Sequence, residues 1–341
     1  MTLVGRYLVL VLVLVLLLFS CTRKENSIFL IEGKTQGTFY TIKYFSSSKK
    51  INKNNIDSVL TILDMSMSSY IDSSNISRIN DNYTIKIDTF LNKVVSRSLS
   101  ICNQTDGAFD ITIAPIVNAY GFGPKSSDFN FKHLDQLGCD ALSIDNGIIN
   151  KKHKSIELDV NGIAQGYSVD VLSEYLKNNN IFDFIINIGG EVYCSGSKNK
   201  KPWLVAIEKP YQNIQLQKYI LKLSNKALAT SGSYRKIKNF NGKIISHTMS
   251  PKTLKPVENN LLSVSIMTDN CMDADAYATA CMSMGLNKSI QFVNENNIEA
   301  CFVYVGENDT LTYMTSGMLG LVSSDSPDYS DLQTSFGAAP Q

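Results

Sequence analysis

The stretch from Cys271 to Cys281, CMDADAYATAC, constrains this chain more than any other, because its composition favours one local structure. Its alanine-rich run has high helix propensity, and we expect a helix with Asp273 as its N-cap. Asp275 and Thr279 are four residues apart, which places both side chains on one helical face. One carboxylate and one hydroxyl suit a hard cation such as Mg²⁺. An acidic first turn also stabilises a helix without any metal, so both interpretations stay open here.

The overall composition is that of an ordinary globular protein. Of the 341 residues, 44% are hydrophobic and 18% are charged, which allows one large domain or two modest ones. The net charge of +1 gives no support for a nucleic-acid surface, so we expect no nucleic-acid partner. The three histidines, His133, His153 and His247, are too scattered for a histidine-rich metal site.

The N-terminal residues have the pattern of a targeting segment. Arg6 supplies a positive charge, residues 7–19 are apolar, and the LFSC sequence ending at Cys21 matches a bacterial lipobox. A run this short is typical of a signal peptide, since a membrane span needs about 20 apolar residues. We therefore expect cleavage of residues 1–20, lipidation of Cys21, and a tether over residues 21–27. A plain secretory signal and an uncleaved anchor are the alternatives, and either also places the body outside the cytoplasm.

Six cysteines follow Cys21, and none forms a C-x-x-C motif or a thiolate zinc pattern. Several lie in apolar stretches, so buried free thiols are the default expectation. A disulfide is possible in an oxidising compartment, but the sequence indicates no pairing.

Strand and helix patterns follow one another without strict alternation, which favours an α+β fold in one domain over residues 28–324. Helix patterns occupy residues 51–67, 89–105, 131–139 and 161–176. Strand patterns occupy residues 27–45, 144–158 (a hairpin around Asn150 and Lys151), 184–188, 192–207, 219–226, 243–248 and 262–267. Residues 68–80 have the composition of a polar loop, and the Ser-, Asp- and Pro-rich residues 325–341 are expected to be disordered.

Four clusters of polar residues and glycine allow a backbone to approach a ligand closely. They are residues 105–110 (TDGAFD), 159–167 (DVNGIAQGY), 187–191 (NIGGE) and 229–235 (ATSGSYR). Ordinary explanations exist, since Gly107 suits a helix C-cap and Asp159 and Asn161 suit helix N-caps. A helix start after Asp159 also suits phosphate binding through free N–H groups.

His247 lies in the sequence SHTMSP, at an expected strand end before a proline turn. A single histidine is more often structural, but other clusters flank this one and histidine is the commonest general base. The chain has no G-x-S-x-G, H-E-x-x-H or G-x-G-x-x-G motif. This argues against ordinary hydrolases, zincins and dinucleotide-binding Rossmann folds.

Taken together and in this order, these clusters resemble the ApbE-type flavin transferases, the FAD:protein FMN transferases. Further matching segments are Gly37 with Thr38, and residues 69–72 (SYID), 76–80 (ISRIN), 121–123 (GFG), 246–247 and 273–279. The matches cover nearly the whole chain after the tether, and many family members carry a lipoprotein signal. The resemblance implies Mg²⁺-dependent transfer of FMN from FAD to a Thr or Ser hydroxyl of a target protein, with release of AMP.

The resemblance also implies site residues. Asp275 and Thr279 would bind the metal through side chains, joined by the main-chain carbonyl of Gly162. The residues implied in binding FAD are Tyr70, which would stack on the isoalloxazine, and Ala108, Phe109, Asp110, Asp159, Gln165 and Met249. His247 is the candidate that assists removal of the hydroxyl proton.

Four positions depart from the family pattern: Gln36 where Met is common, Gln165 where Lys is frequent, and Ser233 and Ser250 where Asp is common. Because Tyr70, Asp275 and Thr279 are intact, we interpret these departures as tuning of the site. The alternatives to a transferase are a Mg²⁺-dependent hydrolase that converts FAD to FMN and AMP, and a flavin-binding lipoprotein without chemistry. A purely structural lipoprotein would leave the polar-glycine clusters without a purpose.

The family also implies a partner and a place in the cell. The expected partner is an acceptor protein with a flavinylated Thr or Ser, a subunit of a membrane redox complex. The lipid on Cys21 would hold the chain in the bacterial cell envelope, facing the periplasm and on the inner membrane rather than the outer.

Overall fold

The computed structural model describes residues 27–125, 137–208, 218–233, 237–240, 242–307 and 309–327. The expected signal peptide, Cys21 and nearly all of the tether lie outside these residues. So do most of the expected helix at 131–139, Arg235, and residues 328–341 of the expected disordered tail. The predictions made for those segments therefore stay predictions.

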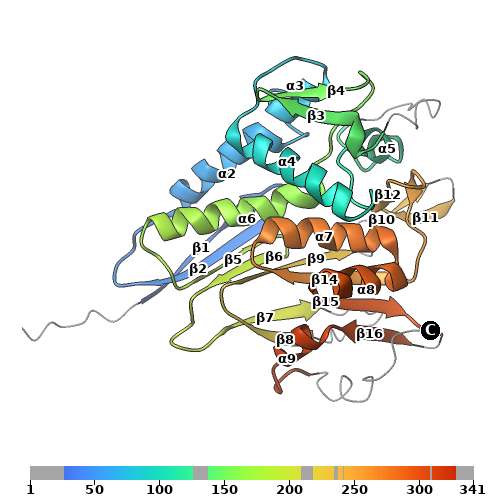
Figure 1. The fold of residues 1–341 in the computed structure, drawn as a ribbon. Helices are drawn as coiled ribbons and strands as arrows, with labels where there is room; N and C mark the ends of the chain where they lie inside the picture. Colours follow the sequence, from blue (N-terminus) through green and yellow to red (C-terminus); the bar gives the residue numbers. More distant parts are fainter. Residues whose placement is uncertain are drawn as a thin grey trace, which may run out of the picture.

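Helices and strands follow one another irregularly along the chain (Figure 1). The helices are α2 (Lys53–Met67), α3 (Asn75–Asn80), α4 (Thr89–Gln104), α5 (Ala114–Ala119), the 3₁₀ turn η2 (Cys139–Ala141), α6 (Asn161–Asn178), α7 (Cys271–Met284), α8 (Leu286–Glu295) and α9 (Ser316–Gly320). The strands are β1 (Ser27–Thr35), β2 (Thr38–Ser46), β3 (Leu142–Asp145), β4 (Ile148–Lys151), β5 (Phe184–Ile188), β6 (Glu191–Ser195), β7 (Trp203–Glu208), β8 (Lys218–Leu223), β9 (Lys226–Gly232), β10 (Ile237–Phe240), β11 (Lys243–Ser246), β12 (Met249–Ser250), β13 (Lys255–Pro256), β14 (Leu261–Thr268), β15 (Glu299–Val305) and β16 (Thr310–Met314).

A central antiparallel sheet has the strand order β1-β2-β5-β6-β9-β14-β15-β16. Its first hairpin turns at Gln36 and Gly37, whose φ angles of 49° and 72° are the positive values that a two-residue hairpin turn needs. The strand pattern over residues 27–45 is thus confirmed as two strands, and the strand at 184–188 is confirmed with the expected bounds. The α+β prediction is confirmed.

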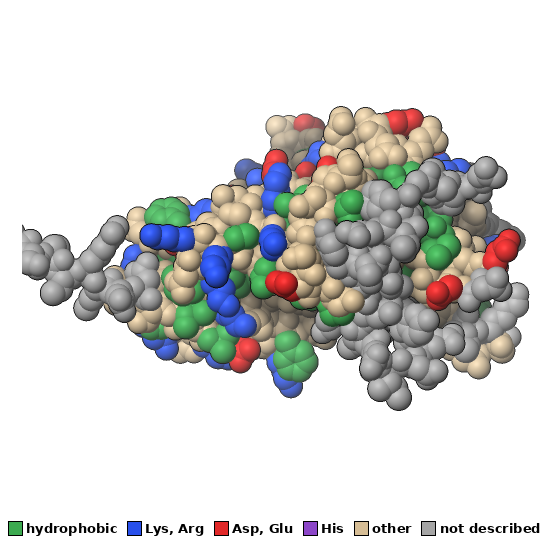
Figure 2. All heavy atoms as spheres, turned by 90° about the horizontal axis from the view of Figure 1, so that it is seen from below, with side chains coloured by type: hydrophobic (Ala, Val, Ile, Leu, Met, Phe, Trp, Pro, Cys, Tyr) green, Lys and Arg blue, Asp and Glu red, His purple; other side chains and the backbone are tan. Residues whose placement is uncertain are grey.

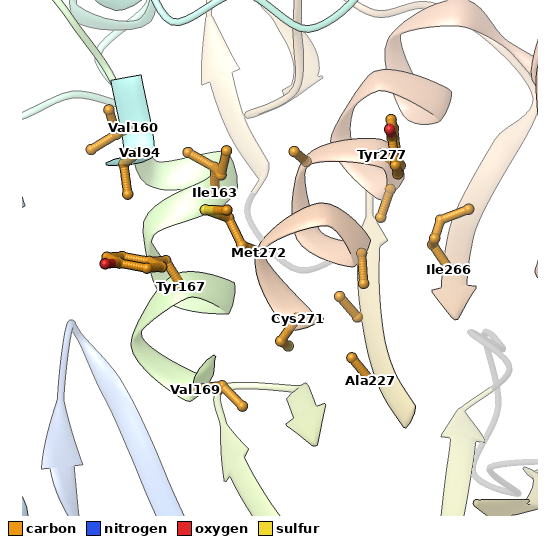
Figure 3. Packing of buried hydrophobic residues seen from close by; sticks show 14 of the residues in the cluster. Val94, Val160, Ile163, Tyr167, Val169, Ala227, Ile266, Cys271, Met272 and Tyr277 are labelled. Carbon is orange, nitrogen blue, oxygen red and sulfur yellow. The ribbon is translucent and has the colours of Figure 1, made fainter. Parts of the chain in front are cut away.

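The long helices cover one face of this sheet, with α6 and α7 side by side at its middle (Figure 1). Between these helices and the strands, Ile163, Tyr167 and Met272 lie in one buried cluster (Figure 3). Gly166 permits the close approach, because a Cβ there would lie 2.3 Å from the Cys271 carbonyl oxygen. The helix crossing therefore depends on a position without a side chain.

A second layer covers part of the opposite face. Strands β7 and β8, with α9, bury Trp203, Tyr219 and Leu221 against residues of the central sheet such as Cys194 and Cys301. Strand β7 shows the alternation of buried and exposed residues that one covered face produces. The molecule therefore has a helical layer, the large sheet, and a smaller β-layer.

Three local predictions are wrong. Helix α7 begins at Cys271 with Asn270 as its N-cap, so Asp273 is inside the first turn rather than the cap. Residues 75–80, expected within a loop, form α3, whose N-cap Ser74 accepts a hydrogen bond from the Ser77 N–H. The β3–β4 hairpin turns at Asn146 and Gly147, a favoured Asn-Gly turn, and not around Asn150 and Lys151.

The cysteines divide into two groups. Cys194, Cys271, Cys281 and Cys301 are buried thiols outside any disulfide, as expected. Cys102 and Cys139 form a disulfide that closes a sequence separation of 37 residues and ties the end of α4 to η2. Within the described residues, no helix has the length and hydropathy needed to cross a bilayer.

Candidate functional site

Asp275 is buried in α7 and faces α6. Its Oδ2 accepts a hydrogen bond of 2.9 Å from the backbone N–H of Gly166. Burial raises the pKa of Asp275 above its ordinary value, the Gly166 bond opposes that shift, and the nearby Asp170 carboxylate adds to it. Among the described residues, no cationic side chain contributes to this shift, so the carboxylate lies where a cation would stabilise its charged form.

Thr279, one turn further along α7, lies against Gly162 at the start of α6. A Cβ on Gly162 would be 3.0 Å from Thr279 Oγ1 and 3.4 Å from the ring of Phe109. Gly162 has φ −84° and ψ 16°, which interrupts the regular helix at this point. Ser231 of β9 adds a further hydroxyl, with its Oγ 3.3 Å from Thr279 Oγ1. The expected metal residues Gly162, Asp275 and Thr279 are thus brought together.

Asp170 fixes the position of this part of α7. Its two carboxylate oxygens accept hydrogen bonds of 2.7 Å and 2.9 Å from the first two helical N–H groups, those of Cys271 and Met272. These N–H groups have no partner within the helix, so a carboxylate from α6 satisfies them. Burial raises the pKa of Asp170 to about 6, against these two bonds.

The segment after α4 brings Ala108, Phe109 and Asp110 to the same region, all buried. Asp106 and Gly107, with φ 50° and 74°, follow the C-cap Thr105 of α4, and the Gly107 N–H donates to the Cys102 carbonyl over 2.8 Å. Asp110 Oδ1 accepts from the N–H and the hydroxyl of Thr112, and burial nonetheless raises the pKa of Asp110. The C-cap of α4 is Thr105, so the expected C-cap at Gly107 is wrong, although Gly107 lies in the turn that closes the helix and leads to Phe109 beside Gly162.

Asp159 and Tyr70 form a second part of the site. Asp159 Oδ1 accepts a 2.8 Å hydrogen bond from the Asn161 N–H, just before α6. Tyr70 is 60% exposed, and its pKa is raised by partial burial and then by the Asp159 charge. Asn80 of α3 holds the neighbouring backbone, because its amide exchanges two hydrogen bonds with Leu158. A cavity of about 20 Å³ next to Asp159 and Ser69 is far smaller than a flavin.

His247 and Met249 lie at the edge of this region. The His247 ring packs against Phe122 of the 121–123 segment at a centroid distance of 6.4 Å. Met249 is buried in the short strand β12, which lies beside α7. The side-chain amide of Gln165, in α6, lies beside Gly189, where an added Cβ would be 3.3 Å from it.

Several residues of the site were not singled out from the sequence. Asp170 contacts α7 across a separation of 101 residues, and no local pattern could reveal that. Gly166 lies inside the GIAQG sequence, whose glycine spacing was the available signal. A cavity of about 630 Å³ elsewhere borders the Cys102–Cys139 disulfide and His153, away from these residues.

The donor set can bind a hard cation. It offers one carboxylate, one hydroxyl and one carbonyl oxygen, which suits Mg²⁺ with water and phosphate in the remaining positions. The described residues contain no cluster of three or more His, Cys, Asp or Glu side chains arranged for a metal. That agrees with this set, because only Asp275 belongs to those residue types.

Comparisons with known proteins point the same way. The FAD:protein FMN transferase of Vibrio cholerae is 30% identical over 323 residues, covering 90% of this chain and 96% of that protein. The protein of the same name from Haemophilus influenzae is 29% identical over 320 residues, covering 87% of this chain and 92% of that protein. The solved structure of the flavin transferase ApbE from Vibrio cholerae has a TM-score of 0.78 at 29% identity, covering 87% of this chain and 99% of that one. Since the model of the ApbE family also matches residues 36–302, the chain belongs to the ApbE family.

Proposed function

We propose that this chain transfers FMN from FAD to a Thr or Ser hydroxyl of a target protein and releases AMP. The observation that carries the proposal is the convergence of Gly162, Asp275 and Thr279 at the start of α6. It occurs in a member of the ApbE family whose relatives are named FAD:protein FMN transferases. The reaction is a displacement at phosphorus, so the protein must position the pyrophosphate and the acceptor hydroxyl.

Three features of the site fit Mg²⁺, which would be held by Asp275, Thr279 and the Gly162 carbonyl. The Asp275 carboxylate is buried, and among the described residues no cationic side chain offsets the resulting rise in its pKa. The Gly166 N–H is directed at Asp275, and the missing side chain of Gly162 lets Thr279 approach the backbone. The bound cation would supply positive charge against the charge of the pyrophosphate.

The flavin would lie across the loops beside this site. Tyr70 has an exposed ring that a planar isoalloxazine can cover, and Asp159 follows in the same region. Ala108, Phe109 and Asp110 offer a rigid wall, because the Phe109 N–H donates to the Thr105 hydroxyl and the Asp110 carboxylate accepts from the Thr112 N–H. Gln165 and Met249 would border the nucleotide. We assign His247 as the residue whose imidazole accepts the proton of the acceptor hydroxyl.

We further propose that the acceptor is a subunit of a membrane redox complex and that the protein works in the bacterial envelope. The lipobox at Cys21 supports lipid attachment, with the protein facing the periplasm at the inner membrane.

The test combines the full chain with FAD, Mg²⁺ and an acceptor domain that bears the target Thr, and follows AMP release and flavin fluorescence on the denatured acceptor. Fluorescence that survives denaturation and requires Mg²⁺ is the expected result. AMP release without labelling would indicate the hydrolase, and bound FAD without AMP release would leave a flavin carrier.

Two variants assign the residues. Asp275→Asn should abolish Mg²⁺-dependent turnover while some FAD binding remains, whereas Asp269→Asn, at an exposed carboxylate, should leave turnover unchanged. Full activity in Asp275→Asn would remove the metal assignment.

Tyr70→Ala should weaken FAD binding, and the matched control is Tyr83→Ala, since Tyr83 is 61% exposed. Equal FAD affinity in both tyrosine variants would place Tyr70 outside the flavin site.

A further inference from the structure

Lysines and exposed apolar side chains gather at the end of the molecule where the described chain begins (Figure 2). This group, called the lysine end below, consists of Ile28, Lys49, Lys50, Phe182, Lys198, Lys200 and Lys201, all exposed. Ile28 and Phe182 are 52% and 59% exposed, so two large apolar side chains lie among these lysines.

These residues come from distant parts of the chain, and hydrogen bonds hold their segments together. The Phe45 N–H, opposite Ile28 in the β1–β2 pair, donates to the Asp183 carbonyl over 2.9 Å. Asp183 Oδ1 then accepts from the Ser197 N–H, at the start of the 198–201 loop. Lys50 Nζ donates to the carbonyls of Asn179 and Asn180, just past the end of α6. The lysine end is therefore one contiguous, fixed surface.

The exposed face of the β1–β2 hairpin continues this surface. Leu30 is 53% exposed and lies opposite Lys43, while Phe39 is 66% exposed with Lys34 Nζ 5.4 Å from its ring centroid. The helical layer lies on the other face of these strands (Figure 1). Figure 2, which views the molecule from below, shows lysines and apolar side chains interspersed on the same half of the molecule.

The charge of this surface differs from that of the whole chain. Seven lysines lie on it, Lys34 and Lys43 added to the five named above, in a protein whose net charge is only +1. The carboxylates of Glu32, on the hairpin face, and of Asp183, which accepts from the Ser197 N–H, lie among these lysines. Exposed apolar side chains among lysines match a bilayer surface, where acyl chains lie below anionic headgroups.

We propose that the lysine end docks on the surface of a bilayer that contains anionic lipids. The proposal rests on the lipid attachment at Cys21 proposed above. Five residues separate Cys21 from Ser27, so an extended tether spans only about 20 Å and keeps this end close to the membrane.

Docking in this way would set the height of the catalytic site. Helix α6 runs from Asn161, beside Gly162, to Asn178, next to the carbonyls that Lys50 contacts. Its 18 residues span about 27 Å. Because the lysine end lies at the C-terminal end of this helix and Gly162 at its start, the site would face an acceptor rather than the lipid itself.

The experiment uses the full chain reconstituted in nanodiscs of phosphatidylcholine with and without phosphatidylglycerol, and measures amide hydrogen exchange. Peptides covering residues 27–34 and 196–202 should exchange more slowly on discs with the anionic lipid. The variant Lys198→Glu/Lys200→Glu/Lys201→Glu should lose this difference, because each lysine favours the docked state about fivefold. Three reversals therefore lower the ratio of docked to undocked protein by about a hundredfold or more.

The control Lys86→Glu/Lys93→Glu/Lys288→Glu changes the net charge equally at exposed positions away from the lysine end, and should keep the protection. If the protein stays attached to both kinds of disc but its amides exchange no more slowly on the anionic one, the docking proposal is overturned and the lipid attachment stands. Chain that binds only the anionic discs would support docking and contradict the lipid attachment, and chain that binds neither would contradict both. If the triple reversal slows labelling of a soluble acceptor domain while exchange on the discs is unchanged, the surface binds an acidic acceptor protein and the proposal is wrong.

Discussion

The substitution Gly166→Ala tests whether the contact between α6 and α7 determines the site. A Cβ at this position would lie 2.3 Å from the Cys271 carbonyl oxygen, 2.7 Å from its carbon and 2.8 Å from Asp275 Cβ. Since ordinary contact begins at 3.4 Å, the helices must separate locally by 3.4 − 2.3 = 1.1 Å. Two of the three opposing atoms belong to the backbone, so no side-chain rotation can relieve the clash.

The expected magnitude follows from three contributions. In an unhindered helix, replacing glycine by alanine would stabilise the protein by about 1 kcal/mol. Overpacking opposes this by about 1–3 kcal/mol, and weakening the hydrogen bond from the Gly166 N–H to the Asp275 carboxylate costs about 1.5–3 kcal/mol more. We therefore expect a net loss of about 1.5–5 kcal/mol in the free energy of unfolding.

The assay is urea unfolding of the purified full chain, together with Mg²⁺-dependent AMP release. Gly320→Ala is the matched control, because a Cβ on this α9 residue would have no heavy atom within 4 Å, and its stability should change by less than about 1 kcal/mol. Gly166→Ala should lower both the unfolding midpoint and the turnover. A Gly166→Ala protein as stable as the Gly320→Ala control, with unaltered turnover, would refute the reasoning.

Three further predictions concern stability. Arg97 donates from Nε and Nη2 to both carboxylate oxygens of Asp273. Because lysine cannot make this paired contact, Arg97→Lys should lower the free energy of unfolding by about 1–2 kcal/mol. In the same chemical unfolding assay Lys226→Met, at the exposed pair with Asp269, should change it by less than about 1 kcal/mol. Because the Cys102–Cys139 disulfide closes a separation of 37 residues, Cys102→Ala/Cys139→Ala should lower the free energy of unfolding by about 3–4 kcal/mol. A reductant should lower the melting temperature of the unmodified chain and leave that of the double variant unchanged. Equal responses of the two proteins would contradict the bond. The pKa of Asp57 is lowered first by the hydrogen bond from Lys53 and then by the one from Tyr40. The ionised Asp57 therefore stabilises the fold at pH values above its ordinary pKa, and this stabilisation is lost as the pH falls below that value. Lys53→Met should reduce the acid sensitivity of the melting temperature, measured in a pH series of melting curves.

Local sequence signals were sufficient where one segment contains the whole cause of its structure. The alanine-rich run of α7 and the apolar face of α6 each follow from residues close in sequence. Where two local causes competed, the prediction failed. Asn270 and Asp273 can both cap a helix, and the choice of Asn270 goes with the Arg97 contact that holds Asp273 within the first turn.

By itself, the sequence determined the α+β class, the bounds of strand β5, the hydrophobic face of α6 and the spacing that puts Asp275 and Thr279 on one helical face. Only the tertiary structure decided that Gly162 meets Thr279, that Asp170 caps α7 from 101 residues away, and that Cys102 pairs with Cys139. The reason is physical. Helix and strand periodicity arise from neighbouring residues, whereas a hydrogen bond or disulfide between distant segments depends on how whole elements pack, and that packing is fixed by the buried surface of the entire sheet.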